Sequence, residues 1–421
     1  MAPCDNGYIH LIKTLGLIAV LACALGAALT TRGSAGSGAA NGLVAYEVRF
    51  HVPGVSGNGS SICVQDLRSG RTWRLTDDPR LDYAEPAWSP DGERLAFSLH
   101  NYRAGKSVIA VLDATGATRI VPGGNGPEYA PSWSPDGKRL VFLSRGGVFV
   151  MTAQGTERKR IVELPPNAPE AIFARPRWSP DGSTISYDAG NPVAIFIVKP
   201  DGTDRRKFIE GHQLAWALDG NRAAYGTELK WPDAGQVHTI DLDGTDRRRL
   251  TNNRAGAGRP AWSPDGTQIA YARYRADLIR TDADLHVMKA DGSQDRVLST
   301  IPFPEVDPAW QPLPDGSQPF GFLKRLPPCA VTGTARNDRL RGTSRDDLMY
   351  GFKGADRLSG GRGADRLAGG PGNDRILGGK GNDVVASGSG IDVVSCGTGR
   401  DRVIAGRRDR VGRDCERVVR R

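Results

Sequence analysis

The sequence predicts an all-β protein in which a six-bladed β-propeller is followed by a C-terminal parallel β-roll. Two internal repeats support this fold class. A tryptophan-containing motif recurs at intervals of 38 to 48 residues through the middle of the chain, and an aspartate recurs at every ninth residue near the C-terminus. Repeats of about 40 to 50 residues with several short strands are typical of propeller blades, whereas nonapeptide repeats are typical of parallel β-helices.

The 421 residues allow two or three domains. We expect five segments, divided where the repeat pattern changes. They are a signal peptide with a small-residue spacer (1–40), the propeller (42–318), a linker (319–330), the roll (331–405) and a C-terminal cap (406–421).

The first segment has the pattern of an export signal. Lys13 is followed by an uninterrupted apolar run from Leu15 to Leu29, which is too short for a comfortable membrane span, and then by small residues. A lipoprotein signal with acylation at Cys23 and a retained single-helix anchor are the alternatives. All three place the bulk of the chain outside the cytoplasm.

The propeller prediction rests on six copies of one motif. They read PAWSPDGERLAF from Pro86, PSWSPDGKRLVF from Pro131, PRWSPDGSTISY from Pro176, LAWALDGNRAAY from Leu214, PAWSPDGTQIAY from Pro260, and a distorted PAWQPLPDG from Pro308. In each copy a strand holding the tryptophan meets an Asp-Gly turn, because glycine supplies the positive φ that a tight hairpin needs. Two further strands complete each unit.

These units resemble the PD40 repeats of TolB-like six-bladed propellers. The resemblance covers about 275 residues and implies a fold rather than a function. Residues Leu43 to Thr76 lack a tryptophan motif, and the unit that starts at Trp310 breaks off at Pro319. We therefore expect the two ends to share the sixth blade. The tryptophans are interpreted as wedges between blades, and the Ser-Pro-Asp-Gly aspartates as turn residues.

The C-terminal repeat is an aspartate at every ninth position: Asp338, Asp347, Asp356, Asp365, Asp374, Asp383, Asp392 and Asp401. An apolar residue stands two positions after each aspartate and is expected to fill a thin core. Three copies are complete, namely GGRGADRLA from Gly360, GGPGNDRIL from Gly369 and GGKGNDVVA from Gly378.

This pattern resembles the hemolysin-type (RTX) calcium-binding nonapeptide. The resemblance implies a roll with two nonapeptides per coil, which stacks aspartates eighteen residues apart and folds on binding several Ca²⁺ ions. The implied ligands are Gly354, Asp356, Gly361, Gly363, Asp365, Gly370, Gly372, Asp374, Gly379, Gly381, Asp383 and Asp392. The match weakens at both ends, where Arg336 and Arg345 replace one glycine and Ser387 and Cys396 replace another.

The cysteines agree with export. Cys396 and Cys415 flank the last turn of the roll, and we expect a disulfide that fixes the cap. Cys63 lies in the apolar segment Ile62-Cys63-Val64, which favours a buried free thiol, and the partner of Cys329 is left open. No CxxC pair indicates zinc.

The net charge is +9, and residues 331–421 carry 19 Lys and Arg against 12 Asp and Glu. Five arginines directly follow a repeat aspartate and are expected to point outward: Arg339, Arg357, Arg366, Arg375 and Arg402. We interpret them as solubilising the roll, with an anionic cell surface as a possible partner. The tail lacks the interleaved aromatic residues that bind nucleic-acid bases, which argues against nucleic acid.

No hydrolase motif of the GxSxG or HExxH type is present. We therefore expect an exported calcium-binding protein whose propeller is a scaffold for a protein or a glycan. The alternative is an extracytoplasmic enzyme, a lyase or glycosidase, with its site in the propeller funnel. Carboxylates or histidines clustered in the funnel would favour the enzyme, and aromatic and mixed polar residues would favour the scaffold.

Overall fold

The computed structural model describes residues 40–49, 59–76, 78, 81–101, 104–124, 126–164, 175–190, 192–227, 235–275, 283–299 and 304–420. Of the segment expected to hold the signal and its spacer (1–40), all but Ala40 lies outside these ranges, and so does Cys23. The described residues contain many strands and one short 3₁₀ helix, η2 (Gly321–Arg325). No helical segment in this described part has both the length and the hydropathy of a membrane span. The all-β prediction is confirmed.

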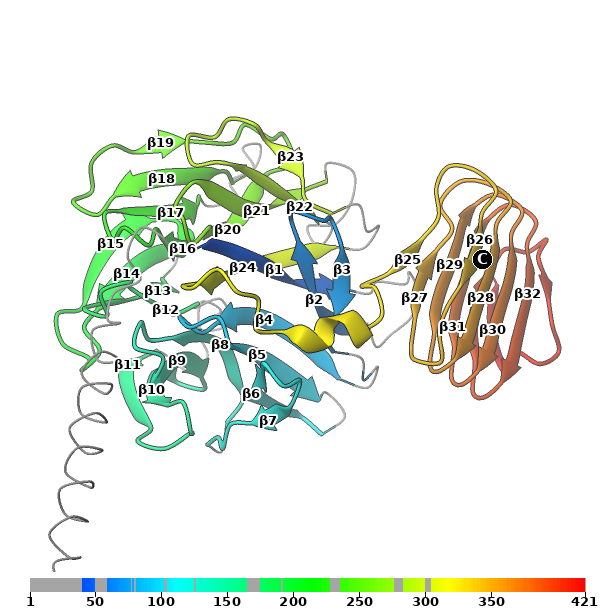
Figure 1. Ribbon diagram of the computed structural model, residues 1–421, viewed down its shortest axis with the longest axis horizontal. Coiled ribbons are helices and arrows are strands. Elements are labelled where there is room, and N and C mark those ends of the chain that lie inside the picture. Colours follow the sequence, from blue (N-terminus) through cyan, green and yellow to red (C-terminus); the bar gives the residue numbers. More distant parts are fainter. Residues whose placement is uncertain are drawn as a thin grey trace, which may run out of the picture.

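Six four-stranded antiparallel sheets form the propeller (Figure 1). Five of them follow one another in the chain. Their strands are β4 (Asp82–Trp88), β5 (Arg94–Asn101), β6 (Lys106–Asp113) and β7 (Thr118–Ile120); β8 (Glu128–Trp133), β9 (Arg139–Ser144), β10 (Gly147–Thr152) and β11 (Lys159–Glu163); β12 (Arg177–Trp178), β13 (Ile185–Ala189), β14 (Ala194–Val198) and β15 (Arg206–Glu210); β16 (His212–Trp216), β17 (Arg222–Gly226), β18 (Val237–Asp241) and β19 (Arg248–Arg249); β20 (Ala257–Trp262), β21 (Gln268–Tyr274), β22 (Ala283–Lys289) and β23 (Arg296–Val297).

The sixth blade joins the two ends of the propeller, as predicted. Its order is β24-β1-β2-β3, with β24 (Glu305–Leu313), β1 (Ala40–Arg49), β2 (Ser60–Asp66) and β3 (Thr72–Arg74). The N-terminal strand β1 therefore lies between a C-terminal strand and its own successor, and pairs with β24 from Ala40–Leu313 to Val48–Glu305. This clasp closes the ring without an open sheet edge between the first and last blades.

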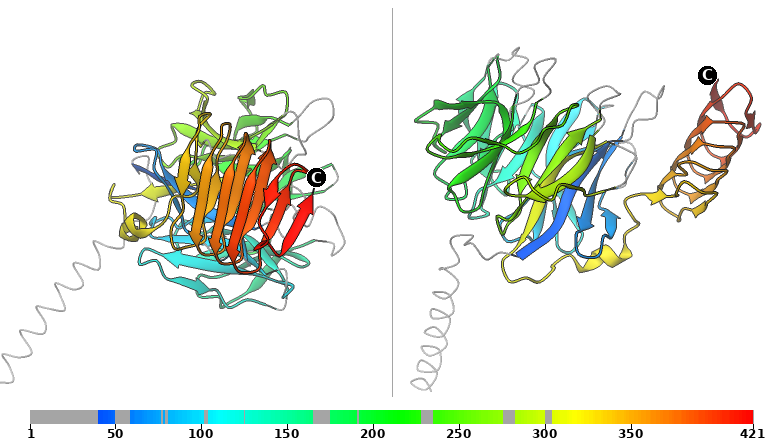
Figure 2. Two further views of the ribbon diagram at one scale, coloured as in Figure 1. Left: turned by 90° about the vertical axis from the view of Figure 1, so that its right-hand side faces the viewer. Right: turned by 90° about the horizontal axis from the view of Figure 1, so that it is seen from above.

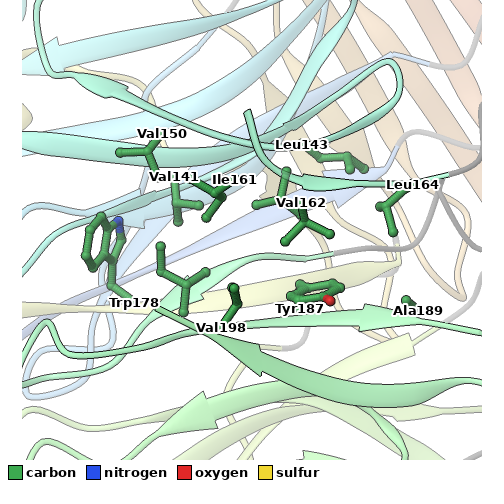
Figure 3. Packing of buried hydrophobic residues seen from close by; sticks show 12 residues of the cluster. Val141, Leu143, Val150, Ile161, Val162, Leu164, Trp178, Tyr187, Ala189 and Val198 are labelled. Atoms are coloured by element: carbon green, nitrogen blue, oxygen red, sulfur yellow. The ribbon is translucent and has the colours of Figure 1, made fainter. Parts of the chain in front are cut away.

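The tryptophans of the repeat lie between blades, as predicted. The indole N–H of Trp133 donates to the carbonyl of Ala87 in the preceding blade at 3.1 Å, and that of Trp310 donates to Ala261 at 3.1 Å. Figure 3 shows Trp178 and Val198 facing Val150 and neighbouring aliphatic side chains across one such interface. The motif is therefore structural: the tryptophans pack between blades, and the indole N–H groups of Trp133, Trp216 and Trp310 also donate a hydrogen bond to the preceding blade.

The Asp-Gly turns also follow the prediction. In the third blade, Asp181 accepts hydrogen bonds from the Ser179 hydroxyl at 2.6 Å and the Ser183 amide at 3.0 Å, while Gly182 has φ +72°. The carboxylate fixes the turn locally, so it is not available for chemistry in the funnel.

The segment predicted to be a linker packs against the propeller. Phe320 is buried, with its ring edge-on to Trp88 at 5.1 Å between centroids. Cys329 forms a disulfide with Cys63 across 266 residues, which corrects the expectation of a free thiol at Cys63. The apolar environment of Cys63 is evident from the sequence, but its proximity to Cys329 is created only by the clasp.

The roll consists of two parallel sheets. The six-stranded sheet has the order β25 (Val331–Thr332), β27 (Leu348–Tyr350), β29 (Arg366–Pro371), β31 (Val384–Ser389), β33 (Arg402–Ala405) and β35 (Arg417–Arg420). The five-stranded sheet has the order β26 (Arg339–Arg341), β28 (Arg357–Arg362), β30 (Arg375–Lys380), β32 (Val393–Thr398) and β34 (Arg410–Val411). Figure 2 shows these strands side by side as a plate next to the propeller.

From β25 to β33 each strand pairs with the strand eighteen residues later, so Leu358 stands beside Ile376 and Leu367 beside Val385; the cap strands β34 and β35 pair at shorter offsets. The residues at two positions after the aspartates form a single buried cluster, as predicted, to which Cys396, Ala405 and Cys415 also belong. This core is one side chain thick between the two sheets. The structure pairs Cys396 with Cys415, the disulfide expected from the sequence.

The roll is also attached to the propeller. Leu348 of β27 joins the buried cluster that holds Val44, Cys63 and Trp310. The Arg366 guanidinium lies against Gly59: a Cβ atom on Gly59, if it had one, would stand 2.8 Å from the nearest guanidinium nitrogen. Arg366 also interacts electrostatically with Asp82 of the propeller. The prediction that Arg366 points into solvent is therefore wrong, because its coil abuts the clasp.

Candidate calcium sites in the roll and a funnel in the propeller

The repeat aspartates line the two edges of the roll, where the strands of one sheet turn into those of the other. Along one edge the Asp338 amide donates to Asp356 at 2.8 Å, Asp356 to Asp374 at 2.8 Å, and Asp374 to Asp392 at 2.8 Å. Each bond uses the Oδ1 atom of the carboxylate eighteen residues on. The predicted stacking of Asp356 with Asp374 is therefore present.

The opposite edge is built in the same way. The amide of Asp347 donates to Asp365 at 2.7 Å, Asp365 to Asp383 at 2.8 Å, and Asp383 to Asp401 at 2.8 Å. The roll therefore carries one column of carboxylates on each edge, at a spacing set by the parallel strands, about 5 Å.

The second carboxylate oxygen of six aspartates is buried and has no hydrogen-bond partner. These aspartates are Asp356, Asp365, Asp374, Asp383, Asp392 and Asp401. A buried anionic oxygen without a donor is costly, because it has lost water and gained nothing in return. Six equivalent cases in register indicate a shared missing partner rather than an isolated packing defect.

The turn glycines bring the backbone close to these oxygens. Oδ2 of Asp365 would lie 2.2 Å from a Cβ on Gly360, and Oδ2 of Asp374 would lie 2.4 Å from a Cβ on Gly369. The glycines predicted as ligands occupy the same turns with positive φ, namely Gly354, Gly361, Gly363, Gly370, Gly372, Gly379 and Gly381. Side chains are excluded there, so carboxylate and peptide groups face one another directly.

The donor set fits a hard cation. Carboxylate and carbonyl oxygens are the ligands that Ca²⁺ prefers; no histidine is placed at the repeat turns, and the one cysteine there, Cys396, is held in a disulfide. Within the described ranges, no group of three or more His, Cys, Asp and Glu side chains is arranged to hold a metal. A cation at these edges would therefore need backbone carbonyls in addition to the aspartates.

Burial and mutual repulsion shift the titration of the aspartates. Burial, together with the negative charges of Asp383 and Asp347, raises the pKa of Asp365 to about 8. Burial and neighbouring aspartates likewise raise the pKa of Asp374 and of Asp383 to about 6. Bound cations would reverse these shifts, since a positive charge favours the ionised carboxylate.

The ends of the aspartate columns differ from the middle. Oδ2 of Asp338 accepts from the amide and hydroxyl of Thr334, at 2.7 and 2.8 Å, and Oδ2 of Asp347 accepts from the corresponding groups of Thr343. Each threonine replaces a turn glycine and supplies the missing donors. The weaker match at the N-terminal end therefore has a structural cause.

Two further aspartates, absent from the predicted ligand set, belong to the columns. Asp401 has the same orphaned Oδ2 as the central aspartates, although the first glycine of its repeat is replaced by Cys396. Asp409 of the cap continues one column, because it accepts from the Asp392 amide at 3.1 Å. Its spacing of seventeen residues breaks the nonapeptide count, so periodicity could not reveal it.

A second candidate site is the mouth of the propeller funnel, a cavity of about 280 Å³. The tryptophan, proline and alanine residues of the six repeats line its wall, and Arg175, Arg177, Gln213, Arg259 and Asp307 line its floor. The wall is apolar and the floor is polar, so the funnel suits a ligand that carries both kinds of group.

Four floor residues, Arg175, Gln213, Arg259 and Asp307, come from one position of the repeat, three residues before each tryptophan, whereas Arg177 directly precedes Trp178; Glu85 and Ala130 hold the same position in the first two copies. Five of these residues have a left-handed backbone without being glycine: Glu85 (φ 56°), Ala130 (50°), Gln213 (58°), Arg259 (56°) and Asp307 (56°). Such residues are uncommon and concentrate at functional sites. A bulge lies at this point in the innermost strands β4, β8, β16, β20 and β24, and Gln213, Arg259 and Asp307 at such bulges line the funnel.

Asp307 is the centre of an ion network across this floor. It pairs with Arg175, and with Arg259 at 2.6 Å, while Arg175 also approaches Glu85 at 3.6 Å. Although burial alone would raise it, the two arginines hold the pKa of Asp307 well below its usual range. Arg177 donates to its neighbour's carbonyl at 3.0 Å and, unlike Arg175 and Arg259, has no described carboxylate within 4.0 Å, although Asp307, Glu85 and Asp188 attract it at longer range.

The fold and the repeats match known families. The family model described as the TolB beta propeller domain matches residues 54–207 and 85–314, and the RTX calcium-binding nonapeptide repeat matches residues 332–367 and 359–394. A crystal structure of TolB from Acinetobacter baumannii superposes with a TM-score of 0.53 at 21% identity, covering 64% of this chain and 66% of that one.

Curated relatives share the propeller only in part. The chain is 28% identical over 225 residues to the uncharacterized peptidase YuxL of Bacillus subtilis, which covers 53% of this chain and 26% of the relative. It is 29% identical over 202 residues to the uncharacterized protein Atu1656 of Agrobacterium fabrum, an alignment that covers 44% of this chain and 68% of the relative. The chain thus spans about a quarter of the first relative. Taken together, the six-bladed closure and these matches show that the chain belongs to the TolB β-propeller (PD40) family and carries RTX calcium-binding repeats.

Proposed function

We propose that this is an exported protein in which Ca²⁺ ions bind along both edges of the roll, and in which the propeller funnel binds a protein or a glycan. The six orphaned aspartate oxygens carry the calcium part of the proposal. The six oxygens are in register along the roll, and the neighbouring glycines keep side chains away from them, which suits a row of hard cations. The RTX repeats also imply calcium binding.

The residues that would hold calcium are the aspartates of both columns and the carbonyls of the turn glycines between them. The ion would supply charge neutralisation where neighbouring carboxylates otherwise repel one another. Because the core of the roll is one side chain thick, much of its folding free energy would come from the bound metal. Magnesium should substitute poorly, since it requires a tighter octahedral shell.

Calcium titration of the full-length protein tests this. We expect binding heat and a gain of β-structure in calorimetry and circular dichroism, both reduced in the variant Asp365→Ala/Asp374→Ala. The matched control is Asp243→Ala/Asp291→Ala, which removes two exposed turn aspartates of the propeller. Unchanged spectra and no heat at millimolar calcium would contradict the proposal.

The funnel supports the scaffold role over the enzymatic alternative. The acid at its centre, Asp307, is held by two arginines, so it is poorly placed to accept or donate a proton. The wall offers tryptophan edges and proline rings, and Arg177 offers a cation for an acidic group. A ligand with an apolar body and a carboxylate matches this arrangement.

Affinity capture from the native envelope with wild-type protein and with Arg177→Gln identifies the ligand class. We expect a partner that the variant retains poorly while its melting temperature stays unchanged. Equal capture by both proteins would exclude the funnel floor as the binding surface. N-terminal sequencing of extracellular protein checks export, with a mature start expected between Thr30 and Gly42, or at Cys23 if acylated.

A further inference from the structure

The outer face of the five-stranded sheet carries an aligned row of arginines. Arg339, Arg357 and Arg375 pair directly across β26, β28 and β30, and Arg410 of β34 continues the row beyond Val393. All four arginines are exposed. Adjacent strands lie about 5 Å apart, so the guanidinium groups form a regular line of positive charge.

The other sheet has no such row. Its corresponding positions hold Leu348, Arg366, Val384, Arg402 and Arg417. Leu348 packs into the propeller core, and Arg366 lies against the propeller near Asp82. The roll thus uses the start of its six-stranded sheet to attach to the propeller and leaves the arginine face free.

The row is uncompensated. Within the described part of the chain, none of the four arginines lies within 4.0 Å of a carboxylate oxygen. Like charges directly opposite each other destabilise a sheet. A face that served only solubility would interleave both signs, so this arrangement indicates a partner that is itself negatively charged.

We propose that the arginine face is a docking surface for a linear acidic polysaccharide, assembled when the roll binds calcium. This rests on the calcium-dependent folding proposed above, because the arginines come into register only in the folded roll. Bound Ca²⁺ also adds positive charge to a segment that already carries 19 basic against 12 acidic residues. Calcium would therefore both align the arginines and increase the positive charge of the surface.

The shape and chemistry of the face favour a polysaccharide over nucleic acid. The second row along the strands holds Arg341, Ser359, Leu377 and Ser395, so no aromatic side chain is available to stack on a base. A flat plate can contact an extended chain along its length, whereas a DNA duplex curves away from a plane. Guanidinium groups bind carboxylates in a bidentate manner and are suited to uronate groups.

The test measures binding of full-length protein to hyaluronan oligosaccharides, with calcium or chelator and at two salt concentrations. In calcium we expect Arg339→Gln/Arg357→Gln/Arg375→Gln to lose at least about tenfold in affinity and to show a weaker salt dependence, because fewer counterions are displaced. The matched control is Arg206→Gln/Arg254→Gln/Arg296→Gln, which removes three exposed propeller charges and should bind like wild type.

Calcium calorimetry on the same variants separates this proposal from the one it rests on. Calcium uptake by the arginine variant should equal that of wild type. A loss of hyaluronan binding in this variant is then caused by the missing arginines and not by a loss of bound calcium. Wild-type affinity in the arginine variant, or tighter binding of duplex DNA than of hyaluronan at equal salt, would overturn the polysaccharide proposal. If the protein takes up no calcium but binds hyaluronan equally well in chelator, the proposed dependence on calcium is refuted. The arginine face would then still be the polysaccharide-binding surface.

Discussion

Each propeller repeat contains residues that hold the blades together and a residue that differs from copy to copy. Within the six propeller motifs the tryptophan is constant and the proline two positions before it is present in five copies, whereas the residue three positions before tryptophan varies from Glu85 to Ala130 to Asp307. The tryptophans pack between the blades, and four residues at the variable position line the funnel: Arg175, Gln213, Arg259 and Asp307. The variation is visible in the sequence, but its meaning requires the left-handed backbone that turns these side chains inward.

Gly372 is predicted to be irreplaceable in its turn. A Cβ there would stand 1.6 Å from the carbonyl oxygen of Gly354, at φ +153°. We expect Gly372→Ala to destabilise the calcium-loaded roll by about 2 kcal/mol or more, measured by denaturant unfolding. The control is Gly321→Ala, where no atom lies within 4 Å and the backbone is not left-handed. Equal stabilities of the two variants would contradict the stacked-turn geometry.

Glu305 should make the propeller sensitive to alkaline pH. Burial raises the pKa of this carboxyl from its ordinary value of 4.5 to about 8. The folded state therefore keeps a proton that the unfolded chain releases above pH 4.5. This stabilising contribution is complete below that pH and is lost as pH rises through about 8, by at most about 1.4 kcal/mol per pH unit.

Thermal melting between about pH 5 and pH 9 checks this, with Glu305→Gln as the comparison. The amide can keep accepting from the Leu285 amide, which Glu305 contacts at 3.4 Å, but it does not titrate. We expect the wild-type melting temperature to fall relative to the variant as pH rises. Parallel pH profiles would show that Glu305 is ionised in the folded protein.

At the scale of elements, the closing of the propeller depends on β1. This strand pairs on both sides, with β24 and with β2, and so completes two ladders at once. Deleting residues Leu43 to Thr76 should leave an open edge and an exposed apolar blade. We expect loss of cooperative melting or aggregation, monitored by circular dichroism and light scattering. Cooperative melting at the wild-type temperature would rule out the clasp as a source of stability.

The end of the roll is a second element with its own test. Cys396 and Cys415 join the last repeat to the cap, with a separation of 19 residues in sequence. Changing both cysteines to alanine should cost about 2 to 4 kcal/mol in the stability of the roll and leaves the Cys63–Cys329 disulfide of the propeller intact. The measurement is calcium-dependent unfolding, with the propeller signal as an internal reference. An unchanged midpoint would mean that Asp409 and the cap strands hold the end alone.

At the scale of the molecule, the sequence predicts both repeat folds because their periods are set by local rules. A nine-residue period marks one turn and one short strand, for which the resemblance to RTX repeats implies two units per coil, and the Trp-to-Trp interval marks one blade. What it could not predict are contacts between the repeat systems, such as Leu348 in the propeller core and Cys63 with Cys329. Such contacts depend on how the clasp strand and the linker are placed relative to each other in the folded protein, and the repeat periods carry no information about that placement.

The disulfide between Cys63 and Cys329 turns most of the propeller into a covalent loop of chain. A protease that cuts once at any bond between these residues opens the loop but releases no fragment. We expect such a nicked protein to migrate as one species on a non-reducing gel and as two after reduction, whereas a cut between Cys329 and Cys396 separates the roll in both cases. A molecule outside the cytoplasm could thus survive nicks across most of its length with its two domains still joined.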